Sequence, residues 1–313
     1  MSARVSVVVP CFNQRHYLRE CIESLRTQDL ADWEMIVVDD CSTDGDPAEV
    51  LAEISDERIY LVRHEKNRGL GAARNTGFTA ATAPLVLPLD SDDALAPTFL
   101  SALVRMLDAD AELDCAFADF ELFGATSGVR QFDLRTMAAL AEWQWLPGAG
   151  VLMKRELWQR AGGYSEAEVL RRGNEDWDFW LRAGAVGFRA ALCPEPLYRY
   201  RQHAESMTLR LVESDHLTRR HMAREHRAFL EKHGSVRQFL AGGYWRSADL
   251  ARRQKRLVRS VTLGVRALVL DGDVRRFVQL ARNNAGEHVA SKNRARVKSA
   301  AQRVGSLLRR ARQ

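Results

Sequence analysis

The chain has 313 residues, of which 46% are hydrophobic and 28% are charged. This composition predicts a globular protein with a sizeable core, and no apolar run reaches the roughly 18 residues that a membrane-spanning helix needs. The formal net charge of +5 hides an asymmetry, because residues 251–313 carry 17 Lys or Arg against 3 Asp or Glu, which leaves an acidic body with a basic tail.

The N-terminal residues lack the charged, apolar and small-residue regions of a signal peptide, so we expect a cytoplasmic protein. Its five cysteines are widely spaced and form no C-x-x-C pair. This spacing favours reduced core thiols over disulfides or a zinc site.

The first half of the chain alternates between β-rich runs and helical patterns, which predicts an α/β fold with a largely parallel sheet. Apolar residues at helical spacing predict a helix at 14–28 and another that opens near Pro97, and the segment between the third and fourth strands is Ala-rich. The predicted strands of this half are 5–9, 34–39, 58–62, 84–89 and 114–120.

The second half becomes helical. Residues 121–150 read as strand and loop, and a strand at 188–193 completes the body of the protein. Long helical stretches with Arg-rich faces follow Thr208. The predicted helices of this half are 154–161, 175–185, 211–233, 236–259, 261–283 and 289–311.

Acidic residues follow two of the predicted strands. The fourth strand ends in "LDSDD", with Asp90 and Asp92 spaced so that both can turn toward one point. Carboxylates suit Mg²⁺ or Mn²⁺, and the ligand crevice of an open α/β sheet lies beyond the carboxyl ends of its strands. The alternative is an Asp-rich turn that caps the next helix, and Asp93 is the most natural turn residue of the three.

The second strand ends in "VVDDCSTDG", which brings Asp39 and Asp40 to the same edge of the sheet. An Asp there can accept hydrogen bonds from a nucleobase imide or from a ribose hydroxyl. The alternative is a second, independent turn.

A glycine-rich segment, "NRGLGAARNTG", follows the third strand. Its Arg68 or Arg74 could contact a phosphate or a base. The alternative is that the segment only starts a helix.

Two later segments offer further chemistry. Glu175, Asp176 and Asp178 stand among aromatic residues at the start of a predicted helix. Apolar surroundings raise the pKa of a carboxyl group, so one of these acids is a candidate general base. The alternative is that the acids only stabilise the helix by interacting with the positive end of its dipole. His203 could complete the coordination of Mn²⁺, or be an ordinary surface or core histidine.

Taken in order, these segments resemble the family 2 glycosyltransferases, which are inverting enzymes with the GT-A fold. The resemblance runs over residues 4–208, from "VSVVVPCFN" to "RYRQHAESMT". It implies a Rossmann-like, mostly parallel sheet sandwiched by helices, and it has no counterpart for the tail. We therefore expect a catalytic domain at 1–208 and a basic α-helical C-terminal region at 209–313.

The resemblance also implies a role for each matching residue. Asp176 resembles the catalytic base, with Glu175 beside it as the competing candidate. The metal, Mn²⁺ or Mg²⁺, is expected on Asp92, Asp90 and His203. The positions expected to bind the nucleotide-sugar are Pro10, Phe12, Asp39, Asp40, Asn67, Arg74, Asp90 and Ser91.

The implied reaction moves a sugar from a nucleoside-diphosphate sugar, with UDP-sugars favoured, to a hydroxyl of a saccharide or lipid-linked acceptor in bacterial cell-surface polysaccharide or glycolipid synthesis. A sugar-1-phosphate nucleotidyltransferase is the nearest alternative, but "PCFNQRHY" is not the glycine-rich, basic phosphate loop that this class carries after its first strand. A non-catalytic scaffold is disfavoured because all the expected acids are present.

The basic tail, residues 251–313, allows three interpretations. Its helices could lie on an anionic membrane surface, which would place the protein peripherally on the inner face of the cell membrane, and Leu257, Val261, Val265 and Leu268 would supply an apolar stripe. They could also form a helical bundle or bind an acidic partner. Specific nucleic-acid binding is not expected, because the catalytic body is acidic.

Overall fold

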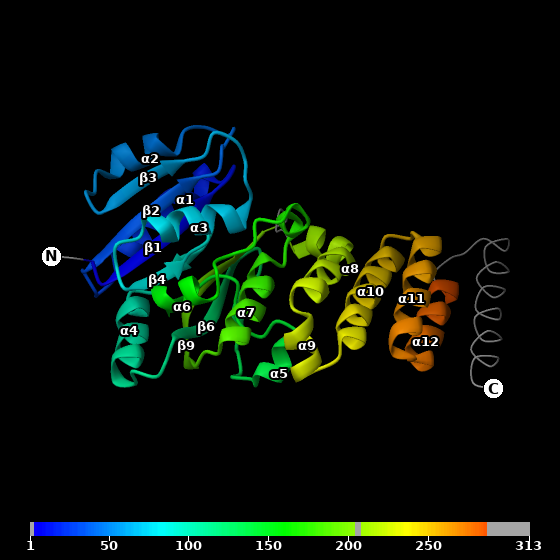
Figure 1. The fold of residues 1–313 in the computed structure, drawn as a ribbon. Helices are drawn as coiled ribbons and strands as arrows, with labels where there is room; N and C mark the ends of the chain where they lie inside the picture. Colours follow the sequence, from blue (N-terminus) through cyan, green and yellow to red (C-terminus); the bar gives the residue numbers. More distant parts are fainter. Residues whose placement is uncertain (1–2, 204–207, 287–313) are drawn as a thin grey trace. The chain divides into compact units, whose positions relative to one another are not determined.

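The computed structural model describes residues 3–203 and 208–286. The chain divides into two compact units, and each is described by itself. The first unit contains residues 1–171 and 175–206, and the second contains residues 172–174 and 207–313 (Figure 1).

The first unit is built on one mixed sheet, whose strand order is β3-β2-β1-β4-β8-β6-β9-β5, with β7 paired to β6. Strands β3, β2, β1 and β4 are parallel, β8 runs against both of its neighbours, and β9 is parallel to β6. The strands are β1 (Val5–Cys11), β2 (Trp33–Asp39), β3 (Ile59–Arg63), β4 (Leu85–Pro88), β5 (Ala94–Leu95), β6 (Cys115–Gly124), β7 (Gly128–Arg130), β8 (Val151–Lys154) and β9 (Ala190–Gln202).

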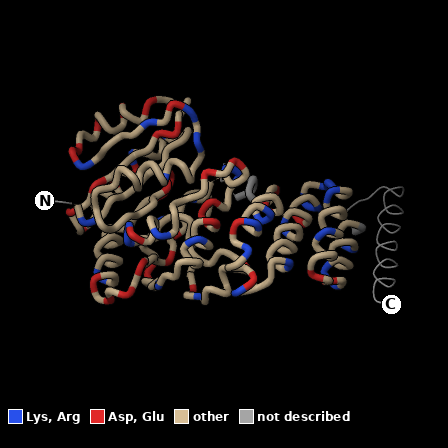
Figure 2. Tube along the Cα trace, viewed as in Figure 1, with Lys and Arg blue, Asp and Glu red and all other residues tan. Residues whose placement is uncertain are grey.

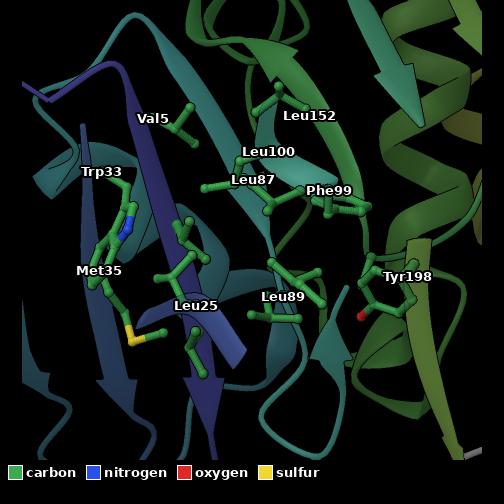
Figure 3. Packing of buried hydrophobic residues seen from close by; sticks show 14 of the residues in the cluster. Val5, Leu25, Trp33, Met35, Leu87, Leu89, Phe99, Leu100, Leu152 and Tyr198 are labelled. Atoms are coloured by element: carbon green, nitrogen blue, oxygen red, sulfur yellow. The ribbon is translucent and has the colours of Figure 1, made fainter. Parts of the chain in front are cut away.

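Helices cover both faces of this sheet. Its helices are α1 (Arg15–Arg26), α2 (Pro47–Ile54), α3 (Leu70–Ala80), α4 (Phe99–Ala109), α5 (Met137–Leu140), α6 (Arg155–Arg160) and α7 (Glu175–Val186), and a 3₁₀ turn spans Glu168–Arg172. Apolar side chains of α1 and α4 pack with Val7 and Val9 into the main core, part of which Figure 3 shows. On the opposite face, a Cβ on Gly77 of α3 would lie 2.2 Å from Val8 Cγ1, so glycine lets this helix approach β1 closely.

The predicted layout of the first unit is confirmed, with differences in detail. Every residue of β1 and β2 is buried, which fits the uninterrupted apolar runs that parallel strands show. Strand β9 extends well past the predicted 188–193, and α2, β5, β8 and the short helix α5, which lies in the segment read as strand and loop, were not predicted. The signal for α2 was present, because Asp46 accepts a hydrogen bond from Ala48 N (2.8 Å) and Pro47 occupies the first turn.

The second unit is a set of helices: α8 (Thr208–Glu225), α9 (Arg227–His233), α10 (Val236–Arg253), α11 (Leu257–Asp271) and α12 (Val274–Gly286). Its core joins aromatic residues of α10 to apolar residues of α11 and α12, namely Tyr244, Trp245, Leu263, Ala267, Leu268, Phe277 and Leu280. Lys and Arg outnumber Asp and Glu on α10 to α12 (Figure 2). None of the described helices is long and apolar enough to cross a membrane.

The predicted boundaries of the tail helices were wrong. The stretch 211–233 is divided near His226, and 261–283 is divided at Gly272, which adopts a left-handed φ of 72° after α11. Such a glycine ends a helix, although the apolar periodicity continues on both sides and hides the break. The stretch 236–259 is likewise divided after Arg253, and the predicted helix 289–311 lies outside the described residues.

Candidate active site

The loops after β1, β2 and β4 meet at the carboxyl edge of the sheet, as the parallel topology requires. Asp40 N donates to Cys11 O (2.9 Å), which joins the first two loops. Gln14, after β1, accepts from Ser91 Oγ (2.6 Å) and donates to Asp92 Oδ2 (3.2 Å), which joins the first loop to the D-x-D segment. Sequence reasoning did not assign Gln14 any role.

Asp92 lies against His203, whose Nε2 is 2.8 Å from Asp92 Oδ2. Burial, and then the charge of Asp90, raise the pKa of Asp92, while the bond to His203 opposes that rise. The Nδ1 atom of His203 is buried and has no hydrogen-bond partner among the described residues. Two of the three residues expected to hold a metal, Asp92 and His203, are therefore adjacent, although 111 positions separate them in the sequence.

Asp93 has a different environment. It is buried and accepts hydrogen bonds from Tyr198 Oη (2.7 Å) and from Arg201 N (2.8 Å), both on β9. Arg201 Nε also donates to Asp92 O (2.7 Å). Asp93 thus fixes the end of β9 against the D-x-D turn, and so places His203 two residues beyond Arg201.

Arg74 joins Asp90, the first acid of the D-x-D segment, to the acidic pair on α7. Its side chain is only 2% exposed, and its two terminal nitrogens bind Asp90 Oδ1 and Glu175 Oε1, both at 3.0 Å. The guanidinium lies over the ring of Tyr164, 5.4 Å from its centroid. Arg74 is enclosed and bridges two carboxylates, and its contact with the nucleotide stays a prediction.

Glu175 and Asp176 differ sharply although they are adjacent at the start of α7. Glu175 is buried, and burial followed by the charge of Asp176 raises its pKa to about 7, while Arg74 opposes the rise. Asp176 is partly exposed. Its Oδ1 accepts from Trp177 N (2.7 Å), and its Oδ2 accepts from Gln144 Nε2 (2.8 Å).

The backbone at Gly148 approaches this carboxylate. A Cβ at Gly148 would lie 2.2 Å from Asp176 Oδ2, so only glycine leaves room for the observed position of the acid. Gln144 and Gly148 both belong to the segment 121–150, whose sequence pattern is weak. Neither was recognised as a candidate, and only the tertiary structure identifies them.

The two acids at the end of β2 also differ. Both oxygens of Asp40 are occupied, since Oδ1 binds His64 Nδ1 (2.6 Å) and Arg68 N (2.7 Å) and Oδ2 binds Gly69 N (2.7 Å). Asp39 Oδ1 accepts from Ser42 N (2.9 Å), and no bond to Oδ2 is recorded among the described residues. Asp39 therefore offers the freer acceptor, and Asp40 shapes the loop at 64–69. His64 was not predicted.

The remaining predicted residues are dispersed around this edge. Pro10 is buried inside β1, whereas the Phe12 ring is 45% exposed just beyond that strand. Ser91 is buried behind Gln14. Asn67 is held by Arg171, which donates to Asn67 O (2.8 Å) and to its side-chain oxygen.

Comparison with known proteins identifies the family of this chain. The model of the family described as Glycosyl transferase family 2 matches residues 6–172, more than half of the 313 residues. The succinoglycan biosynthesis protein ExoO of Rhizobium meliloti is 32% identical over 230 residues, which cover 68% of this chain and 64% of ExoO. The E. coli protein named UDP-Glc:alpha-D-GlcNAc-diphosphoundecaprenol beta-1,3-glucosyltransferase WfgD is 33% identical over 128 residues, covering 41% of this chain and 50% of WfgD.

Solved structures show the fold. Residues 1–349 of S. aureus TarS, in complex with UDP-GlcNAc, match with a TM-score of 0.62 at 18% identity, covering 99% of this chain and 92% of that chain. The mannosyltransferase PcManGT from Pyrobaculum calidifontis, in complex with GDP-Man and Mn²⁺, matches with a TM-score of 0.58 at 18% identity, covering 96% of this chain and 85% of that chain. The chain therefore belongs to glycosyltransferase family 2 and has the GT-A fold, as its motifs predict.

Proposed function

We propose that this chain is an inverting, metal-dependent glycosyltransferase. It transfers a sugar from a nucleoside-diphosphate sugar, with UDP-sugars favoured, to a hydroxyl of a saccharide or lipid-linked acceptor in bacterial cell-surface polysaccharide or glycolipid synthesis. The observation that carries the proposal is the Arg74 bridge. It links Asp90, two positions before the proposed metal ligand Asp92, to Glu175, next to the proposed base Asp176, with both contacts at 3.0 Å.

On this proposal, the donor lies along the carboxyl edge of the sheet. Asp39 supplies an acceptor for the base or ribose, and the exposed ring of Phe12 offers a face for stacking. Asp90 is partly exposed while Arg74 fixes one of its oxygens, so its other oxygen is available to the ribose. UDP-GlcNAc and GDP-Man in the two structural neighbours, and UDP-Glc in the name of WfgD, support a nucleotide-sugar donor.

The residues present fit a divalent ion that shares its coordination with the donor. The described residues contain no group of three or more His, Cys, Asp or Glu arranged to hold a metal. Asp92 and His203 nevertheless provide a carboxylate and an imidazole that face one another, and Mg²⁺ or Mn²⁺ often takes one or two protein ligands plus substrate phosphates. When bound, such an ion would neutralise the charge that develops on the departing diphosphate.

Asp176 is the proposed base. It is partly exposed, whereas Glu175 is enclosed and paired with Arg74. The acceptor oxygen attacks the anomeric carbon as the bond to the nucleoside diphosphate breaks, and its proton passes to an Asp176 carboxylate oxygen. One displacement inverts the anomeric configuration. Gln144 and the close backbone at Gly148 hold that carboxylate in place.

The experiment that tests the proposal measures release of nucleoside diphosphate from a panel of UDP- and GDP-sugars, with Mn²⁺, Mg²⁺ or a chelator present. We expect Asp92→Asn and Asp176→Asn each to lower turnover by at least about 100-fold with an unchanged melting temperature. Asp108→Asn, at an exposed surface pair with Arg4, is the control and should keep full activity. NMR of the anomeric proton in the product tests inversion.

The same assay separates the alternatives. Near-normal turnover in Asp176→Asn would move the base role to Glu175 or end the proposed mechanism. Release of pyrophosphate from a nucleoside triphosphate and a sugar 1-phosphate would support a nucleotidyltransferase instead. Specific binding of a polysaccharide by a wild-type protein that releases no nucleoside diphosphate would support a scaffold.

The proposed organisation is a catalytic domain at 1–208 and a basic helical region at 209–313, held peripherally on the inner face of the cell membrane. Part of the predicted apolar stripe is buried in the helical unit, because Leu268 belongs to its core and Val265 packs against that core. Val258 is exposed and remains available to an anionic surface, and the sequence of 251–313 supplies an excess of basic residues. Flotation with liposomes at physiological salt tests the membrane association. We expect the protein to bind anionic liposomes and not to bind neutral ones.

A further inference from the structure

One large aromatic side chain near the proposed base has no role in the mechanism so far. Trp143 is 47% exposed, whereas Trp145, two residues later, is 3% exposed and packs against Phe117. Tryptophan carries a large apolar surface, so an indole left half in water within an otherwise anchored segment indicates a binding surface.

Trp143 directly precedes a residue that contacts the proposed base. Its neighbour Gln144 donates to Asp176 Oδ2 (2.8 Å) and to Leu146 O (3.0 Å), so the backbone at 143–146 runs along the edge of that carboxylate. Consecutive Cα atoms are about 3.8 Å apart, which puts the Trp143 backbone on the order of 10 Å from Asp176 Oδ2. That separation matches the span of one or two sugar rings.

The surroundings of the indole favour a saccharide over a lipid chain. The guanidinium of Arg135 lies 6.0 Å from the ring centroid, and Arg135 pairs with the exposed Asp133 at 2.7 Å. Thr136 and Glu142 are also exposed. A flat apolar ring beside a charged guanidinium suits a sugar, whose C–H faces stack on the ring while its hydroxyls meet the charged group. An acyl chain would need a continuous apolar groove.

We propose that Trp143 is a platform for a sugar ring of the acceptor. Arg135 orients the indole, and the stacked ring presents a hydroxyl toward Asp176. This inference rests on the proposed function, because it assigns the acceptor side of the same site, and it names a saccharide as the part of the acceptor that the protein recognises.

The test compares Trp143→Ala and Trp143→Phe with the wild-type protein, using p-nitrophenyl glycosides of glucose, galactose and N-acetylglucosamine as acceptor probes. We expect Trp143→Ala to raise the acceptor KM about three- to tenfold, which is what one aromatic stacking contact supplies, and Trp143→Phe to restore most of the loss. The KM for the sugar donor and the melting temperature should not change. Tyr60→Ala, at an equally exposed aromatic on β3, is the matched control.

A second readout does not depend on turnover. Saturation-transfer NMR with the same glycosides should show contact between the sugar protons and the wild-type protein, and Trp143→Ala should lose that contact. An unchanged acceptor KM in Trp143→Ala, an equal rise in the KM for the donor, or equal saturation transfer in wild type and variant would overturn the platform. Failure of the proposed function looks different, because the wild-type protein would then release no nucleoside diphosphate from any donor.

Discussion

Arg74→Met is the substitution whose consequence can be worked out most fully from the structure. It removes a buried guanidinium that pairs with Glu175 and Asp90 at 3.0 Å each, and replaces it with an apolar side chain of similar length. Breaking a buried pair leaves a charge without compensation and costs about 3–5 kcal/mol. Most of that cost falls on Glu175, whose side chain is 8% exposed, because the 31% exposed side chain of Asp90 can be hydrated.

The cost of this substitution should depend on pH. Because its pKa is raised to about 7, wild-type Glu175 is charged at pH 8.5 and mostly protonated at pH 6, and loss of Arg74, which holds that pKa down, raises it further in the variant. At pH 6 no buried charge is orphaned, and the loss shrinks toward the roughly 1–3 kcal/mol of an unsatisfied hydrogen bond. We therefore expect Arg74→Met to destabilise the protein by about 3–5 kcal/mol at pH 8.5 and by clearly less at pH 6.

Urea unfolding followed by circular dichroism, at both pH values, measures this difference. Arg19→Met is the control, because Arg19 pairs with Glu53 on the surface, where both side chains are at least half exposed and such a pair contributes at most about 1 kcal/mol. A destabilisation by Arg74→Met that is the same at pH 6 and pH 8.5, or no larger than that of Arg19→Met, would refute the reasoning about the bridge.

Three further predictions follow from the same contacts. Burial raises the pKa of Glu175 in the folded state from 4.5 to about 7. Between these pH values the folded state keeps a proton that the unfolded state has lost, so the free energy of unfolding of the wild-type protein falls as pH rises. Glu175→Gln should remove about 3 kcal/mol of that fall, measured by urea unfolding at pH values from 4.5 to 8. Gly148→Ala should displace Asp176 and lower kcat at least about tenfold while the KM for the donor stays constant, and an unchanged kcat would contradict the close approach. Asp40→Ala should lower the free energy of unfolding by about 1–3 kcal/mol, because three hydrogen bonds are lost. Asp39→Ala should mainly weaken UDP binding, measured by calorimetry. If both variants change the unfolding free energy and UDP affinity equally, the structural role of Asp40 and the binding role of Asp39 are not distinct.

Sequence reasoning correctly predicted the parallel strands whose carboxyl ends lie at the candidate site. The runs at 5–9 and 34–39 are dense in β-branched and apolar residues, which only a strand buried on both faces explains, and parallel topology then brings their ends together. The same reasoning failed at β8 and in the tail helices. Strand β8 is too short to show periodicity, and Gly272 interrupts an amphipathic pattern that otherwise continues.

The contacts that assemble the site were beyond reach from the sequence for a physical reason. Arg74 and Glu175 are separated by 101 positions, and Gln144 and Asp176 by 32, so no local spacing encodes either pair. Arg74 was recognised as a candidate cation, but a cation near acids serves equally well as a phosphate ligand or as a structural bridge. Burial bears on this choice, and burial is a property of the folded chain.

Burial also explains a feature that the acidic motifs share. Three adjacent pairs of acids occupy the site, and in each pair one carboxylate is used inside the protein: Asp40 by the loop at 64–69, Asp93 by β9, and Glu175 by Arg74. The other member of each pair, Asp39, Asp92 or Asp176, keeps an oxygen or an exposed surface that can meet a ligand. An internally bonded carboxylate next to an open one fixes the backbone that carries the open group, which a single flexible acid would not achieve. Substituting the anchored member should therefore cost mainly stability, and substituting the open member mainly activity. An open oxygen or an exposed surface, and not place in the motif, then distinguishes the member of each pair that the proposed mechanism uses.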